Sequence, residues 1–197
     1  GATARLVVGL LAWFAAGSLA QRQVREGRPA ERQSVLRPLY LHFFTVASML
    51  ATLGAAAMLL AGALRVVLRL PVDSTGAQQL ALLVVGGCGW LYHTLVLAED
   101  TAAGSRTQRQ ESLVRIRRYL VAGVALSAAV VAVAGLIQAV LRSQFQTGVG
   151  EVLRSQLAWA TALLAVAVPP WVAMWTRAQA AVATEGDVVV ARAGIHR

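Results

Sequence analysis

Five long apolar stretches constrain the fold of this chain more than any other feature. They cover roughly residues 3–20, 39–64, 79–98, 119–141 and 155–175, and each is close to the ~20 residues with which a helix crosses about 30 Å of hydrocarbon. None shows the strict alternation of a transmembrane β-strand. With 57% hydrophobic and 14% charged residues, the composition is also far from that of a soluble domain. The sequence therefore predicts an all-α, polytopic transmembrane helix bundle.

The first stretch can also be read as a secretory signal peptide, because Arg5 precedes an apolar run that ends in Ser18-Leu19-Ala20. Cleavage after Ala20 would leave five arginines in the next 17 residues of an exported chain, and basic segments resist export. We therefore interpret residues 3–20 as a membrane helix. The start at Gly1 is interpreted as that of a fragment or a processed product.

The arginines predict the orientation of the chain. The loops at 21–38 and 99–118 and the residues that follow the last apolar stretch, Arg177 included, carry 13 arginines, whereas the opposite side carries five. Since basic loops stay in the cytoplasm, we expect a bacterial plasma (inner) membrane protein with its N-terminus outside and its C-terminus inside. The predicted organisation is a five-helix transmembrane domain at 1–180 and a cytoplasmic tail at 181–197, in which Val188–Val190 have the pattern of a short strand.

An internal repeat is indicated by aromatic residues at similar spacing. Trp13, Trp90 and Trp171 are separated by 77 and 81 residues, and Tyr40 and Tyr119 by 79. These spacings predict parallel two-helix hairpin repeats, with residues 3–20 as the second half of a unit whose N-terminal helix is missing. The five aromatic side chains are expected to anchor the helices at the membrane interfaces.

The repeated pattern is a basic residue, Tyr and an apolar helix ("LRPLYL", "IRRYL"), followed by a helix with Trp and a polar exit ("AWFAAGSLAQ", "PWVAMWTRAQ"). It resembles the repeat-built, multi-pass bacterial membrane domains that are catalogued only as a domain of unknown function. The resemblance covers nearly all of residues 5–180. It implies a bundle of paired helices and assigns no activity, cofactor or catalytic residue.

Two histidines, His42 and His93, are the leading candidates for a ligand site, because ionisable residues inside membrane helices are costly and often functional. Both are predicted near the cytoplasmic ends of consecutive helices, where facing imidazoles could bind haem iron or a chlorin pigment. In the alternative, each imidazole hydrogen-bonds a neighbour or a lipid phosphate. Val121, at the position equivalent to His42, favours this alternative, so we expect no cofactor.

Arg65, Pro169 and Pro170 are further candidates for a functional role. Arg65 is interpreted as an interface anchor whose guanidinium snorkels to the headgroups, with substrate binding as the alternative. Pro169 and Pro170 are predicted to kink or break the last helix, and broken helices line the binding sites of some transporters. The sequence places no acidic residue or polar cluster at the same depth in the membrane as the two prolines. Small-solute transport is therefore only the second alternative function.

Small residues predict where helices approach one another closely. They are found at Gly86–Gly89, and at Gly54 and Gly62, which are about two helical turns apart.

The charged residues indicate what the protein binds and show no pattern typical of a catalytic site. All nine carboxylates fall in loops or tails, and no Cys/His cluster has metal-site spacing, so no enzyme is expected. The net charge of +9 comes from arginines around the membrane, which favours anionic lipid headgroups over nucleic acid. Residues 99–118 form either a solvated connector or an amphipathic helix at the headgroups, with Arg115, Arg117 and Arg118 as lipid contacts.

Taken together, these patterns predict a non-enzymatic scaffold or interaction subunit of a membrane assembly. Its expected partners are the bilayer and other membrane subunits, or the missing N-terminal helix. Haem or pigment binding through His42 and His93 is the first alternative.

Overall fold

The computed structural model describes residues 36–72, 74–102, 108–145 and 150–194, and isolated positions nearer the N-terminus. These residues form four α-helices and no strand: α3 (Leu36–Val67), α4 (Gly76–Ala102), α5 (Gln108–Phe145) and α6 (Gly150–Gly194). Each is long and apolar enough to cross a membrane. The all-α, multi-pass bundle predicted from the sequence is confirmed. The helix predicted at 3–20 lies almost entirely outside the described residues.

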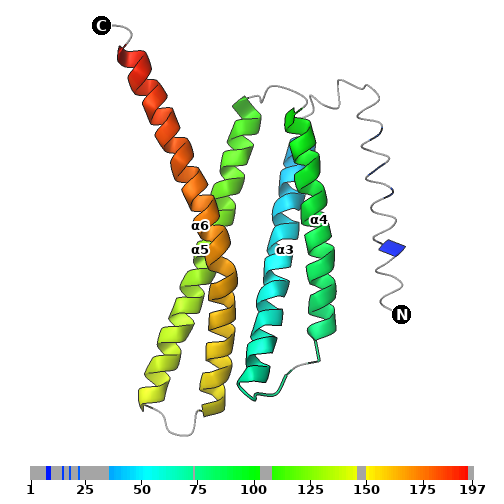
Figure 1. Ribbon diagram of the computed structural model, residues 1–197, viewed down its shortest axis with the longest axis vertical. Coiled ribbons are helices and arrows are strands. Elements are labelled where there is room, and N and C mark those ends of the chain that lie inside the picture. The colour runs from blue at the N-terminus through cyan, green and yellow to red at the C-terminus, as the bar shows by residue number, and fades with distance from the viewer. Residues whose placement is uncertain are drawn as a thin grey trace.

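The four helices form two antiparallel hairpins, α3–α4 and α5–α6, whose first helices run in the same direction (Figure 1). Helix α3 packs against both α4 and α6 and therefore joins the hairpins, whereas α4 lies at the edge of the bundle. One end of the bundle, the Leu36 end, contains the start of α3, the end of α4 and the start of α5. The opposite end, the Val67 end, contains the two hairpin connections.

Helices α3 and α4 approach each other closely where α4 carries glycine. A Cβ atom added to Gly86 would lie 2.8 Å from the Thr52 hydroxyl oxygen and 3.2 Å from the Ser48 carbonyl oxygen. One added to Gly89 would lie 3.0 Å from the Ser48 hydroxyl oxygen. The prediction of close packing at Gly86–Gly89 is confirmed for these two residues. It is wrong for Gly54 and Gly62, where an added Cβ would meet nothing within 4 Å, because each of them lines a cavity between helices.

Helices α5 and α6 pack through alanines and one polar contact. Ala132, Ala139, Ala160 and Ala162 are all almost completely buried. The Gln156 amide nitrogen donates to the carbonyl oxygen of Gly135 at 3.2 Å and to the side-chain oxygen of Gln138 at 2.8 Å. In lipid, where burial of apolar surface does not drive helices together, small side chains and such hydrogen bonds carry the association.

Two of the helices, α5 and α6, extend well beyond their predicted bounds. Residues 108–118 are the first turns of α5, so they form neither a solvated connector nor a separate surface helix. Residues 188–190 belong to α6, and the strand predicted there is wrong. A helix that has already formed adds residues at little cost, whereas a lone strand would leave its backbone groups without partners.

Pro169 and Pro170 lie inside α6 without interrupting it. The ribbon of α6 changes direction partway along, in its orange part, and its C-terminal turns project away from the bundle (Figure 1). Two missing N–H donors and two bulky rings account for a bend. Of the two predicted outcomes, a kink or a break, the structure has the kink.

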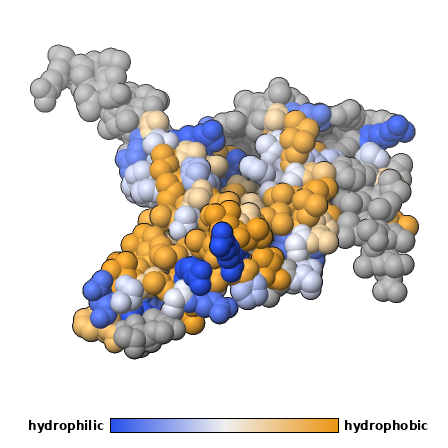
Figure 2. Space-filling model, turned by 60° about the horizontal axis from the view of Figure 1, so that its bottom comes forward, coloured by the Kyte–Doolittle hydropathy of each residue, from blue (hydrophilic) through white to orange (hydrophobic). Residues whose placement is uncertain are grey.

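The surface of the bundle is largely apolar. Figure 2, turned so that the Val67 end comes forward, shows broad hydrophobic areas along the helices and hydrophilic residues in separate patches. Only 22–28% of the most apolar window of each span is buried inside the chain. Most of the apolar surface therefore faces lipid or another protein.

Candidate functional site

His93 is the most deeply buried large side chain of the described residues, at 1% exposure. Its Nδ1 atom lies 2.7 Å from the carbonyl oxygen of Gly89, one turn earlier in α4, and donates to it when that nitrogen is protonated. Its ring stacks on Phe44 of α3, with centroids 5.7 Å apart and planes at 19°. Tyr40 and Tyr92 contact it edge-on. The aromatic cluster closes the α3–α4 interface towards the Leu36 end.

His42 lies on the other side of α3. Residues 42 and 44 are about 200° apart around a helix, so His42 faces away from the Phe44 side that holds His93. His42 is 9% exposed, and Arg117 of α5 acts on it electrostatically. The structure therefore places the two imidazoles on opposite faces of α3. This geometry does not bring them to one shared iron or pigment.

Of the predicted interface residues, Tyr40 lies near the start of α3, whereas Trp90 and Trp171 lie near the middle of α4 and of α6. Tyr40, Trp90 and Tyr119 are exposed, Trp171 is half-buried, and Trp13 lies outside the described residues. In the first turns of α5, Arg115 is exposed and Arg117 and Arg118 are half-buried. The three arginines are near the Leu36 end, and their contact with lipid headgroups remains a prediction.

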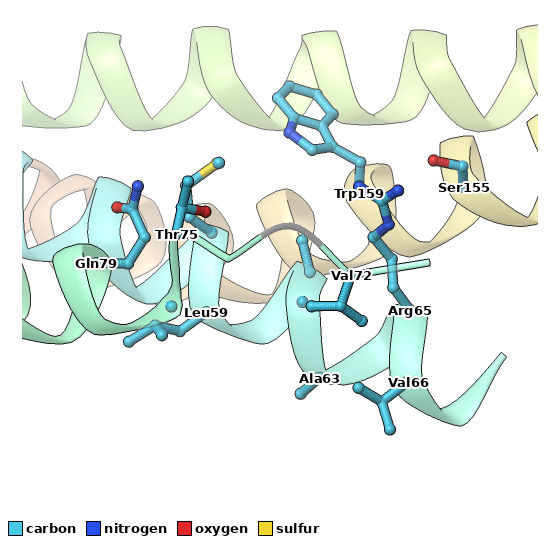
Figure 3. A pocket seen from close by; sticks show the side chains of 13 residues that line it. Leu59, Ala63, Arg65, Val66, Val72, Thr75, Gln79, Ser155 and Trp159 are labelled. Atoms are coloured by element: carbon cyan, nitrogen blue, oxygen red, sulfur yellow. The ribbon is translucent and has the colours of Figure 1, made fainter. Parts of the chain in front are cut away.

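A cavity that was not predicted lies at the opposite end of the bundle. This Arg65 pocket has a volume of about 270 Å³ and includes Arg65, Met58 and Gly62 of α3, Gln79 of α4, and Ser155 and Trp159 of α6. The Arg65 side chain extends from α3 towards Trp159 and Ser155 (Figure 3). The pocket thus combines one cation and several hydrogen-bonding side chains with an apolar wall.

The Arg65 pocket exists because α4 begins short of the end of α3. Gly86 contacts Thr52 and Gly89 contacts Ser48, and the same pairing continued would place Gly76 opposite Gly62, about five residues or ~8 Å before the end of α3. After Val67 the chain reverses: Arg69 has a φ of 56°, and the Leu70 N–H donates to the Arg65 carbonyl oxygen at 2.9 Å. The connection to α4 then forms one wall of the pocket.

The neighbouring Arg154 has a different role from Arg65. Its guanidinium donates to the carbonyl oxygens of Gly150 and Leu68, at 3.1 and 3.3 Å. It therefore ties the start of α6 to the chain reversal that follows α3. Arg65 carries the one charge among the described residues that line the pocket.

A second cavity, of about 260 Å³, lies between α3, α5 and α6 nearer the middle of the bundle. Its lining is apolar and includes Met49, Leu53, Val121, Leu163 and Pro170. The bend in α6 thus opens onto a hydrophobic space. Within the described residues, no group of three or more His, Cys, Asp or Glu side chains could hold a metal ion.

The sequence favoured an interface anchor over substrate binding for Arg65 and did not indicate the pocket, because the other walls of the pocket come from residues far away in the chain. Ser155 and Trp159 follow Arg65 by 90 residues or more, and neither forms a motif with it.

Comparison with known proteins identifies a family. The profile of a domain of unknown function, DUF5671, matches residues 1–88 and 115–195. No curated protein and no solved structure matches the chain significantly. The matched segments cover most of the 197 residues, so the predicted membership of an uncharacterised family is confirmed. The chain belongs to the DUF5671 family of domains of unknown function.

Proposed function

We propose that this multi-pass membrane protein is a non-enzymatic interaction subunit, and that the outward face of α4 binds another membrane helix. The observation that carries the proposal is the position of α4 at the edge of the bundle, where, among the four described helices, it packs substantially against α3 alone. Leu80, Val84, Leu91 and Leu95 follow one another at helical spacing and are each more than half exposed. They form a continuous apolar stripe, which we call the α4 stripe.

Gly87 lies within the α4 stripe and leaves open space beside it. An added Cβ there would meet nothing within 4 Å, in contrast to Gly86 one residue earlier. A glycine between large apolar residues lets a second backbone come close, which is the usual basis of helix association in lipid. The two neighbouring glycines therefore have different roles. Gly86 lets α4 pack closely on α3, and Gly87 would let a helix of another chain pack closely on α4.

The described carboxylates support a role without bond-breaking chemistry. Glu99 and Asp100 are near the end of α4, and Glu111 and Glu151 near the starts of α5 and α6, all of them exposed. Asp100 forms an ion pair with Arg37 at 3.1 Å, which fastens the ends of α3 and α4 together. These four carboxylates lie within the end turns of helices, where the sequence had predicted loops or tails, and they do not converge around one buried site.

The proposed topology has the Leu36 end in the cytoplasm of a bacterial cell and the Val67 end outside. The arginine distribution supports it, with 13 arginines on the first side and five on the second. Parallel hairpin repeats belong to the same proposal. They are supported by the common direction of the α3–α4 and α5–α6 hairpins and by a family match in two segments.

A photo-crosslinking amino acid at Leu91 tests the proposed function in the native membrane. We expect a discrete adduct in which mass spectrometry identifies a helix of a second membrane protein or a second copy of this chain. The matched control is the same amino acid at Leu126, an exposed residue of α5, which should give mainly lipid adducts. Adducts only to lipid, or only to residues 3–20 of the same chain, would contradict the proposal.

A further inference from the structure

We propose that the groove between α3 and α5 binds one anionic phospholipid, whose phosphate lies beside His42 and Arg117 and whose acyl chain occupies the apolar cavity of about 260 Å³. This inference is independent of the α4 stripe, because α4 contributes no wall to the cavity. It gives the Leu36 end a specific lipid site, whereas the sequence predicts only general contacts between headgroups and the arginines of α5.

The apolar cavity opens between α3 and α5. Helix α3 packs extensively against α4 and α6 but only slightly against α5, and α6 closes the back of the space with Leu163, Val166 and Pro170. Gly54 of α3 and Val124 of α5, which also line the cavity, are exposed. Apolar cavities stay dry and take up apolar ligands. In a membrane, the chain of a neighbouring lipid is the apolar group at hand.

A stripe of buried residues on α3 leads from the cavity towards the Leu36 end. Met49, which lines the cavity, follows Thr45 by four residues and His42 by seven, so the three share one face of the helix. The Thr45 hydroxyl already donates to the carbonyl oxygen of Leu41 at 2.7 Å. Seven residues span about 10 Å along a helix. A lipid whose chain fills the cavity therefore has its headgroup near the level of His42.

The imidazole of His42 lacks a protein partner. Its Nδ1 atom is buried and has no hydrogen-bond partner among the described residues, although the residue as a whole is only 9% exposed. His93 differs, since its Nδ1 atom lies 2.7 Å from the carbonyl oxygen of Gly89. Buried polar groups are nearly always hydrogen-bonded. A half-turn of the ring exchanges its nitrogen and carbon positions, so His42 can offer an N–H donor to a ligand at its exposed edge.

Arg117 brings a cation from α5 to the same place. It is half-buried, acts electrostatically on His42, and precedes Val121 of the cavity lining by about one turn. Among the residues that the structure describes, no carboxylate pairs with Arg117, and the charge that acts on it is that of the neighbouring Arg118. A guanidinium in this setting suits a phosphate, which accepts two of its N–H donors at once.

Native mass spectrometry of the delipidated full chain tests the site with three probes: phosphatidylglycerol, diacylglycerol with the same chains, and inorganic phosphate. We expect phosphatidylglycerol to bind, and Arg117→Gln to weaken it about tenfold, the usual scale for a lost hydrogen bond to a charged group. Arg115→Gln is the matched control, since Arg115 is exposed and about 200° away around the same helix. It should change the affinity less than twofold.

Replacement of the histidine separates binding from packing. His42→Phe keeps a ring of similar size and removes both nitrogens, so it should weaken phosphatidylglycerol binding about fivefold, as for one lost hydrogen bond. It should also raise the free energy of unfolding of the delipidated protein, because it removes a buried nitrogen without a partner. A purely structural histidine would give the opposite result, lower stability with unchanged binding, and that outcome would overturn the proposal.

Filling the cavity provides a test that keeps the polar groups. Gly54→Leu adds a side chain into open space, improves helix propensity, and should weaken phosphatidylglycerol binding at least tenfold without loss of thermal stability in detergent. Gly62→Leu is its control, because Gly62 is equally open but lines the Arg65 pocket instead. Phosphatidylglycerol affinity unchanged within twofold in both Arg117→Gln and Gly54→Leu would overturn the proposal.

The other two probes can also overturn it. Inorganic phosphate that binds as tightly as phosphatidylglycerol would show a site for free anions, and diacylglycerol that binds equally well would show that the phosphate is not recognised. Glu26 and Glu31 lie outside the described residues, so a variant with both changed to Gln tests whether the chain itself neutralises Arg117. Phosphatidylglycerol binding that appears only in that variant would contradict the proposal.

Discussion

The two hairpins of this bundle are held together by different means. Helices α3 and α4 meet at Gly86 and Gly89, where the backbone of one helix lies against Ser48 and Thr52 of the other, and a buried histidine among aromatic rings closes the interface. Helices α5 and α6 meet through alanines and the Gln138–Gln156 hydrogen bond. An interface of glycines tolerates no added atom, whereas one of alanines leaves ordinary contact distances, such as 3.5 Å from an added Cβ on Gly135 to Ala160.

The first hairpin leaves more space beside its helices than the second. Within the part of the chain that the structure describes, α4 packs mainly against α3, and its late start leaves the Arg65 pocket beside α3. The second hairpin has no equivalent late start, since α5 ends at Phe145 and α6 begins at Gly150.

The largest effect is expected at the closest contact. Gly86→Leu would force α3 and α4 apart, because even its Cβ would lie 2.8 Å from the Thr52 hydroxyl oxygen. We expect the free energy of unfolding to fall by about 3 kcal/mol, as for severe overpacking. Denaturation in mixed micelles measures it. Gly87→Leu, one residue away in open space, is the control, and equal losses in both variants would break the proposed distinction between the two glycines.

A smaller effect is expected from the aromatic cluster. His93→Ala removes a ring stacked on Phe44 and should lower the free energy of unfolding by about 2 kcal/mol, at the low end for buried large-to-small changes. His93→Phe keeps the ring and should recover most of that loss. If both variants instead lost a haem absorption band present in the wild type, His93 would be a ligand and its packing role secondary.

The smallest effect is expected in the second hairpin. A double-mutant cycle with Gln138→Leu and Gln156→Leu should give a coupling energy of about 0.6 kcal/mol, the average for interhelical hydrogen bonds in membranes. Gln144→Leu, at an exposed position of α5, should leave the free energy of unfolding nearly unchanged. A coupling energy larger than the loss of unfolding free energy measured for Gly86→Leu would reverse our ranking of the two interfaces.

The sequence predicted the helices well because length and hydropathy decide whether a segment crosses a membrane. The predicted spans 39–64, 79–98, 119–141 and 155–175 all fall inside observed helices. The ends were predicted too short, because polar residues such as Gln108 and Arg115 end the hydrophobic stretch without ending the helix. Hydropathy predicts the part of a helix that lies within the hydrocarbon, whereas the helix itself can continue beyond the membrane.

The contacts between helices were harder to predict. Gly86 and Gly89 could be recognised as packing residues, yet Gly54 and Gly62 have the same appearance in the sequence and face open space. Only the rotation of each helix about its axis separates the two cases, and an apolar helix in lipid carries little sequence signal for that rotation. For the same reason His42 and His93 looked like a pair although they lie on opposite faces of α3.

The most direct test of the account is whether the two ends of the bundle lie on opposite sides of a membrane. In a Cys88→Ala background, single cysteines at the exposed positions Arg69 and Glu99 are treated with a membrane-impermeant maleimide. We predict that Arg69→Cys is labelled in intact cells and Glu99→Cys only after permeabilisation. Labelling of both cysteines in intact cells, or of neither until the membrane is opened, would contradict the four-helix membrane-spanning arrangement.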